Sequence, residues 1–278
     1  MKLATIRTGD GTRAVRVDDD HYAPLDAKDV GELLERPDWP DLAAAPPARE
    51  PLGGTEFAPL VPRPGKILCV GLNYRTHIKE MGRELPQYPT LFAKFPEALV
   101  GASDPVMLPP ESDALDWEAE LAVVLGATVR RADLAEAEAA IAGFSVLNDV
   151  TLRDWQYRSP QWLQGKTFER TTPFGPVLVT PDELPGGCRP RLDLSCSVDG
   201  ELMQKAGTDD LVFDPVELVR YASTMLTLRP GDVIATGTPG GVGHARQPAR
   251  YLTAGARLVT ELSGIGRLDN AVVAEVAA

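Results

Sequence analysis

The chain has 278 residues, of which 44% are apolar and 24% are charged, and its formal net charge is −12. These values are typical of a globular protein with one large domain, or with a large and a small one. The acidic balance disfavours a nucleic-acid partner, and no apolar run approaches the length of a membrane span. A polar N-terminus unlike a signal peptide, together with three widely spaced cysteines, favours a reduced, cytoplasmic setting.

The first 61 residues predict a small N-terminal domain and a linker. Residues 2–7 favour a strand, the Gly9-Asp10-Gly11 stretch favours a hairpin, and residues 30–34 favour a helix. Prolines crowd the polar segment that follows, and such segments are typical of connectors. We therefore expect a larger catalytic domain over residues 62–278.

Strands dominate that larger part. They are predicted over residues 66–70, 91–94, 121–125, 144–147, 176–179, 192–198, 233–235, 257–262 and 271–276. Asp199-Gly200 is a strong hairpin turn signal. Because helices interrupt these strands without regular alternation, a doubly wound parallel sheet is disfavoured, and we predict an α+β fold with a mixed sheet.

Two helices are expected within the larger part. One is alanine-rich and covers residues 132–141. The other follows Asp214, which has the features of an N-cap, with a proline at the first helical position and a glutamate at the capping-box position. Helical spacing predicts a buried face on the second helix. Its residues are Leu218, Tyr221, Ala222 and Met225.

Acidic residues stand at the ends of two apolar strands. Glu118 and Glu120 precede the strand at 121–125, and residues two apart in a strand point to the same face. Burying both unpaired is costly, so they favour either a solvated strand end or a hard cation. Asp149 ends the next apolar strand. Three carboxylates suit Mg²⁺ or Mn²⁺, whereas zinc would favour His or Cys ligands.

His77 and Glu80 form a candidate base. The segment favours a short helix with Asn73 as its N-cap, and residues three apart share a helical face. A carboxylate beside an imidazole fixes the tautomer and raises the basicity, as a general base requires. The alternative is an exposed helical pair that contributes little to stability.

Three cations lie near these acids in the chain. Arg153, at the start of a predicted short helix, either clamps a substrate carboxylate in bidentate fashion or pairs structurally with Asp154 or Asp149. Lys94 and Lys166, considered singly, are compatible with surface lysines whose stems cover apolar surface.

A glycine-rich loop follows the strand at 233–235. The stretch from Thr236 to Gly243 is either a tight turn or a loop that binds a carbonyl or an oxyanion through its N–H groups. It lacks the Gly-Lys-Ser/Thr ending of a P-loop. The chain also lacks a Gly-x-Ser-x-Gly elbow, which argues against a serine hydrolase.

The order and spacing of these motifs resemble the fumarylacetoacetate hydrolase family over about residues 59–276. This resemblance is specific because it rests on several motifs together and not on any single one. The matching stretches are Gly71-Leu72-Asn73-Tyr74 with His77, Phe92-Ala93-Lys94, Asp116-Trp117-Glu118 with Glu120-Leu121, Asn148-Asp149-Val150-Thr151 with Arg153-Asp154, Lys166 with Gly175-Pro176, and residues 231–239. One departure is Glu169, which replaces the usual Asp and precedes Arg170, and which we expect to reshape the pocket rim.

The resemblance implies a mixed β-sandwich roll, a homodimer and a 2-oxo acid substrate. It also implies Mg²⁺ or Mn²⁺ on the three acids. The remaining site residues would be the catalytic His77, Glu80 and Lys166, with Arg153, Gln156, Thr238 and Tyr74 binding substrate. Glu80 would orient His77, and Lys166 would stabilise negative charge.

Three functions are compatible with that resemblance. The first is a metal-dependent hydrolase that cleaves a C–C bond in acylpyruvates or related diketo acids through a metal-bound enolate. The second is an isomerase, decarboxylase or tautomerase that acts at the same site on 2-oxo or 2-hydroxydienoic acids of aromatic catabolism. The third is a non-catalytic binding protein, which the full set of acids, His77 and Lys166 disfavours.

Overall fold

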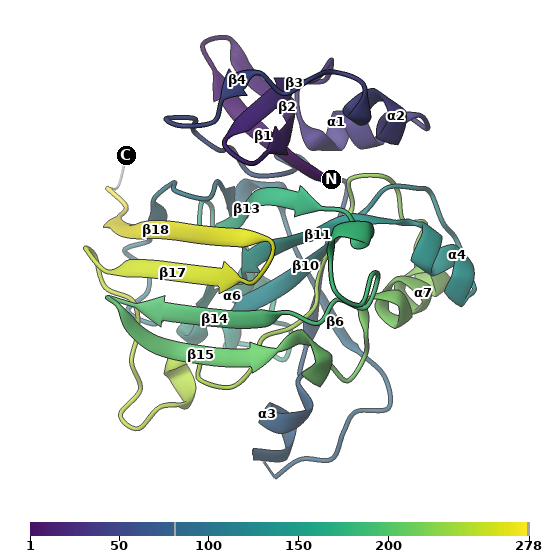
Figure 1. Cartoon of the computed structure of the whole chain (residues 1–278). Helices are drawn as coiled ribbons and strands as arrows, with labels where there is room; N and C mark the ends of the chain where they lie inside the picture. Colours follow the sequence, from purple (N-terminus) through teal and green to yellow (C-terminus); the bar gives the residue numbers. More distant parts are fainter. Residues whose placement is uncertain (81, 277–278) are drawn as a thin grey trace.

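The computed structural model describes residues 1–80 and 82–276 (Figure 1). A small N-terminal unit lies above a larger part in which a long sheet faces a five-stranded sheet. The N-terminal unit consists of β1 (Lys2–Thr8), β2 (Gly11–Asp18), β3 (His21–Pro24), α1 (Val30–Leu34), α2 (Trp39–Ala44) and β4 (Glu50–Pro51). The predicted first hairpin and first helix are thus confirmed.

The long sheet has the order β4-β3-β2-β1-β13-β11-β10-β16-β5-β6, with β7 beside β13. Its strands in the larger part are β5 (Ile67–Gly71), β6 (Thr90–Lys94), β7 (Leu99–Val100), β10 (Ala119–Leu125), β11 (Ile141–Asn148), β13 (Thr172–Val179) and β16 (Val233–Ala235). Because β1 pairs with β13, the N-terminal strands continue this sheet. The domain boundary near residue 62 stays a prediction.

The second sheet has the order β15-β14-β17-β18-β8. Its strands are β8 (Val106–Leu108), β14 (Asp193–Val198), β15 (Glu201–Gly207), β17 (Arg257–Leu262) and β18 (Gly266–Ala274). A two-stranded ladder joins β9 (Leu115–Asp116) to β12 (Thr151–Leu152). Most pairs are antiparallel, but β16–β5, β13–β7 and β18–β8 are parallel. The predicted α+β fold with mixed sheets is confirmed.

Strand β10 is buried on both faces. Leu121 and Val123 belong to the core cluster that also holds Leu194 of the second sheet. Ala122 and Val124 belong to a second cluster, shared with residues of α1. Side chains two apart share a face, so Glu120 points to the same side as Ala122. The two glutamates therefore lie on the face of the long sheet that is turned away from the second sheet.

The helices of the larger part are α3 (Arg75–Glu80), α4 (Leu134–Ala139), α5 (Arg153–Gln156), α6 (Leu163–Lys166) and α7 (Pro215–Met225). The capping box at Asp214 is confirmed. The predicted buried face of α7 is partly wrong, because the buried residues include Val216, Leu218, Val219 and Ala222, whereas Met225 is 50% exposed. Packing selects a face rotated away from Tyr221 and Met225. Within the described residues, no helix is long and apolar enough to cross a membrane.

Candidate active site

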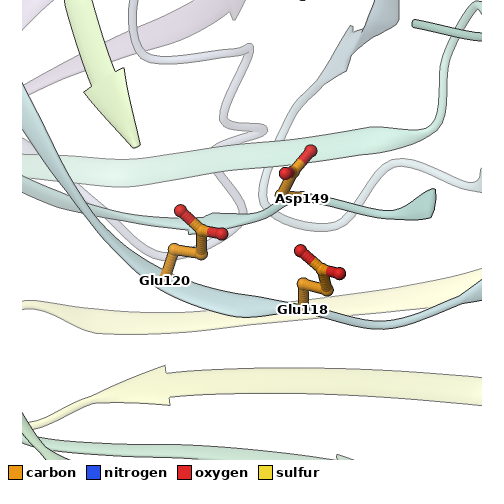
Figure 2. A group of neighbouring side chains, drawn as sticks. All are labelled: Glu118, Glu120 and Asp149. Carbon is orange, nitrogen blue, oxygen red and sulfur yellow. The ribbon is translucent and has the colours of Figure 1, made fainter. Parts of the chain in front are cut away.

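The three predicted metal ligands come together at the meeting point of two strands (Figure 2). β10 and β11 are antiparallel, with Ala119 opposite Asn148, so the start of β10 lies beside the end of β11. The N–H of Asp149 donates to the Glu118 carbonyl at 2.8 Å. One carboxylate oxygen from each of Glu118, Glu120 and Asp149 lies within 4.8 Å of the other two. Oxygen ligands that share one Mg²⁺ or Mn²⁺ require such spacing.

Two buried lysines neutralise part of this acidic cluster. The ammonium of Lys166 lies 2.7 Å from Glu118 Oε2 and 2.7 Å from Asp149 Oδ2. Lys94 donates to Asp149 Oδ1 at 2.7 Å. Burial alone would raise the pKa of Asp149, but Lys166 and Lys94 lower it further than burial raises it. Asp149 is therefore ionised, and the simple interpretation of these two residues as surface lysines is wrong.

Glu120 differs from its two neighbours. Among the described residues it takes part in no ion pair, and its Oε2 accepts a hydrogen bond from the N–H of Gly237 at 2.7 Å. Burial, Asp149 and Glu118 raise its pKa well above 4.5. A buried carboxylate with two acidic neighbours and no cation of its own is the donor that a divalent ion would satisfy. The residues present therefore fit Mg²⁺ or Mn²⁺.

The raised pKa of Glu120 predicts a pH-dependent effect of the ion on stability. Without metal, a carboxyl group whose pKa is raised by folding stabilises the fold below its unfolded-state pKa of about 4.5. This contribution is lost as the pH rises through the raised pKa of the folded state. Mg²⁺ binds the deprotonated form, so the rise in melting temperature caused by Mg²⁺ should grow with pH across the same window. Scanning calorimetry in Mg²⁺ and in chelator, between about pH 5 and 8, measures this difference.

The variant Glu120→Gln is the matched control for that measurement, since it cannot titrate. The effect of Mg²⁺ on its melting temperature should vary less with pH than in the unmodified protein. Equal pH dependence in both proteins would show that another group is responsible.

Arg153 lies beside the acids but does not use the structural partners predicted for it. Its Nε donates to Asp116 Oδ2 at 2.7 Å, and its Nη1 donates to Gln156 Oε1 at 2.9 Å. Its Nη2 lies 2.7 Å from Glu118 Oε1 without the alignment of a hydrogen bond. The predicted pairing with Asp154 or Asp149 is therefore wrong. Nη2 therefore has buried N–H groups that make no hydrogen bond within the described residues.

The glycine-rich loop binds carboxylates of the protein itself. Gly237 has a φ of +100° and donates to Glu120, and a Cβ there would lie 2.8 Å from the Val70 carbonyl oxygen. Gly243 donates to Asp116 Oδ1 at 2.7 Å. A side chain at either position would push the loop off the acid that it holds. The loop thus fixes one of the predicted metal ligands and the carboxylate that orients Arg153.

A cavity of about 290 Å³ opens beside the acids. Five of the predicted catalytic and substrate-binding residues line it together with Glu118. They are His77, Lys166, Arg153, Gln156 and Thr238. The Thr238 hydroxyl already donates to the Ala119 carbonyl at 3.0 Å. Phe92 and Trp162 form an aromatic wall, with their ring centroids 5.4 Å apart.

Four other predicted features either do not line that cavity or lie outside the described side chains. Tyr74 is buried and borders a neighbouring cavity, and burial and Glu120 raise its pKa. Asn73 does not cap α3, because its amide bonds the backbone of Phe213 and Thr236. Glu80 ends α3, but its side chain lies outside what the structure describes. Glu169 is exposed and is not among the lining residues, so it does not shape this cavity.

Comparison with known proteins agrees with this geometry. Residues 66–273 match the model of the fumarylacetoacetate (FAA) hydrolase C-terminal family. The chain belongs to this family. The oxaloacetate tautomerase FAHD2B of Bos taurus is 44% identical to it over 225 residues, which cover 80% of this chain and 71% of the relative.

Solved structures of the family have the same fold. Fumarylacetoacetate hydrolase from Exiguobacterium antarcticum is 32% identical, with a TM-score of 0.89 over 99% of this chain and 100% of that one. The 5-carboxymethyl-2-hydroxymuconate delta-isomerase from Mycobacterium smegmatis is 30% identical, with a TM-score of 0.80 and full coverage of both chains. This family member is therefore an enzyme of a superfamily that includes hydrolases, isomerases and tautomerases.

Sequence reasoning assigned no role to two residues of this FAA hydrolase family site. Asp116 was part of a matching motif, but no local pattern shows that its carboxylate accepts from Arg153 and from the loop after β16. His244 lines the cavity although no partner was predicted for it, because its neighbour Tyr251 is seven residues away in a segment without regular structure.

Proposed function

We propose that this protein is a metal-dependent tautomerase of a short 2-oxo acid, interconverting its keto and enol forms. The observation that carries the proposal is the cavity itself. Its lining includes Glu118 of the acidic cluster together with Lys166 and Arg153, and its volume of about 290 Å³ lies at the lower limit of ordinary ligand sites. The 44% identity to an oxaloacetate tautomerase supports the same assignment.

The cations of the site would hold and polarise the acid. Arg153 offers the buried N–H groups of Nη2 to the substrate carboxylate. Lys166 donates two of its three N–H groups to Glu118 and Asp149, so that one N–H remains for the oxo oxygen of the substrate. A bound Mg²⁺ or Mn²⁺ would act as a Lewis acid on that oxygen. Negative charge that develops there as a proton leaves the neighbouring carbon is thus stabilised.

His77 would move that proton. Burial lowers the pKa of Lys166, but Asp149 and Glu118 raise it more, so this lysine stays protonated and is no base. Imidazole has an ordinary pKa near neutrality, which suits proton transfer in both directions. The predicted orienting role of Glu80 stays a prediction, as do the homodimer and the cytoplasmic location.

Hydrolytic C–C cleavage is the second candidate. His77 also borders a neighbouring cavity of about 500 Å³ that is lined by polar residues such as Thr76, Lys205 and Asp210. That cavity offers a route by which water would reach the imidazole for attack on a diketo acid. The similarity to fumarylacetoacetate hydrolase supports this reaction as well.

A panel of oxo acids separates the two reactions. Oxaloacetate, acylpyruvates and 2-hydroxydienoates would be incubated with Mg²⁺, Mn²⁺ or chelator, and the products identified by NMR. Faster exchange between keto and enol forms with all carbons retained supports the tautomerase. Formation of two shorter acids from one substrate identifies the hydrolase. A protein that converts none of the oxo acids in the presence of metal contradicts both proposed reactions.

Replacing His77 by alanine should lower kcat for tautomerisation about a hundredfold to ten-thousandfold, because a positioned general base contributes that much. The binding of Mg²⁺, followed by calorimetry, should stay within about twofold, since His77 is not among the clustered acids. His21→Ala, an exposed histidine on β3, is the control. Turnover equal to that of the control would rule out His77 as the base.

A further inference from the structure

We propose that His244 is the distal anchor of the site and selects 2-oxo acids with a second carboxylate. The inference rests on the proposed function and concerns the part of the cavity wall that His244 forms. Its basis is the way in which the loop after β16 presents this one side chain to the cavity.

The backbone of His244 is fixed by Asp116, which is fully buried. Asp116 Oδ1 accepts from the N–H of Gly243 at 2.7 Å, and Oδ2 accepts from the N–H of His244 at 3.0 Å. A side chain at Gly243 would collide with the Arg250 carbonyl. The short turn Gly243–Ala245 is thus held against the site by two hydrogen bonds to a charged acceptor, which are stronger than neutral ones.

The same carboxylate holds the substrate clamp. Asp116 Oδ2 also accepts from Nε of Arg153 at 2.7 Å. The backbone N–H of His244 and the Nε–H of Arg153 therefore both donate to the same oxygen atom, Oδ2 of Asp116. Two groups fixed in this way keep a constant separation, which is what recognition of two anionic groups on one small molecule requires.

Neighbouring rings fix the direction of the imidazole. Nδ1 of His244 lies 2.9 Å from the hydroxyl of Tyr251, and the ring lies 5.1 Å from that of Tyr157 at an interplanar angle of 33°. If the hydroxyl donates to Nδ1, the proton of a neutral imidazole must be on Nε2. Nε2 has no hydrogen-bond partner in the described part of the chain. In that tautomer, His244 has an N–H donor to offer to a ligand.

The charge of the cavity identifies the class of that ligand. Among the described residues that line it, Glu118 is the only acid, and it belongs to the metal end. His244 and Arg83 are lining residues too, and they offer hydrogen-bond donors rather than a carboxylate. His244 is exposed, so water satisfies the Nε2 proton in the free protein, and an apolar or cationic tail bound against it would displace that water without supplying an acceptor. A second carboxylate would satisfy it, and the small volume restricts the acid to a short chain.

The test compares oxaloacetate with its 4-methyl ester, which keeps the oxo acid but lacks the distal charge. His244→Ala should lower kcat/KM for the diacid roughly ten- to a hundredfold, mainly through KM, and leave the ester nearly unchanged. His244→Gln, which keeps an amide donor, should recover part of the loss. Binding of oxalate to the Mg²⁺ protein, which probes the metal end alone, should be equal in all variants and in the control His21→Ala.

Tyr251→Phe gives a second readout that does not remove the imidazole. It frees the ring to rotate and should weaken diacid turnover less than His244→Ala does, again sparing the ester. It also decides the question should His244→Ala fail to fold.

Two results would overturn the inference, and they differ from failure of the proposed function. Equal losses on the diacid and the ester, or no loss on either, would remove the distal anchor while tautomerisation stands. An unmodified protein that neither turns over an oxo acid nor binds oxalate in Mg²⁺ would overturn the proposed function itself.

Discussion

Replacing Glu120 by glutamine is expected to lower kcat/KM on 2-oxo acids on the order of ten-thousandfold and to weaken Mg²⁺ binding strongly. The ion contributes several kcal/mol of charge stabilisation, and each 1.4 kcal/mol corresponds to about tenfold in rate. Glu120 is the cluster acid without an ion pair in the described residues, so this change leaves Lys166 and Lys94 with their partners. Titration calorimetry with Mg²⁺ and product analysis by NMR measure both effects.

The fold should survive this substitution and become more stable without metal. The glutamine oxygen still accepts from the Gly237 N–H, and the burial of a charge and the repulsion by Asp149 and Glu118, which together raise the pKa of Glu120, disappear. Glu169→Gln is the matched control, because Glu169 is exposed and does not line the cavity. Normal affinity of Glu120→Gln for Mg²⁺ would show that this carboxylate is not a ligand.

Replacing Lys94 by methionine is expected to destabilise the metal-free protein by about 3–5 kcal/mol, because removing one partner of a buried ion pair leaves its charge undercompensated. The side chains of Lys94 and Asp149 are both fully buried and 2.7 Å apart. Urea unfolding in chelator measures the loss. Lys205→Met, an exposed lysine on β15, is the control and should change stability by less than about 0.5 kcal/mol.

Mg²⁺ should reverse much of the damage in Lys94→Met. Removing one positive charge makes the cluster more negative, so a divalent ion binds more tightly and restores more stability than in the unmodified protein. The two proteins would be compared by the shift in urea midpoint on adding Mg²⁺. A smaller shift in the variant would show that Lys94 helps to assemble the site rather than competing with the ion.

The cluster of three acids could be predicted from sequence because its pattern is local. Two glutamates at a spacing of two share a strand face wherever that strand lies, and the apolar run after them indicated burial. The acid after the next strand joined them because neighbouring strands in sequence pair often. The capping box at Asp214 is local as well, and the structure confirms it.

The wrong predictions concern the choice of partner. One of the two alternatives for Arg153 placed it beside Asp149 or Asp154, but it bonds Asp116, which pairs with Thr151 across the β9–β12 ladder. The buried face of α7 was misjudged because its neighbours, not its spacing, decide which side is covered. Each error required knowledge of a segment distant in the chain.

The sequence by itself therefore determined many of the strands, the common face of the two glutamates and the family to which the chain belongs. Only the tertiary structure decided which cation neutralises which acid, that Glu120 has no ion pair within the described residues, and that His244 lies at the cavity. The physical reason is that strand faces and helix caps follow from short-range geometry. Charge pairing and cavity walls depend instead on segments that meet only when the sheets close.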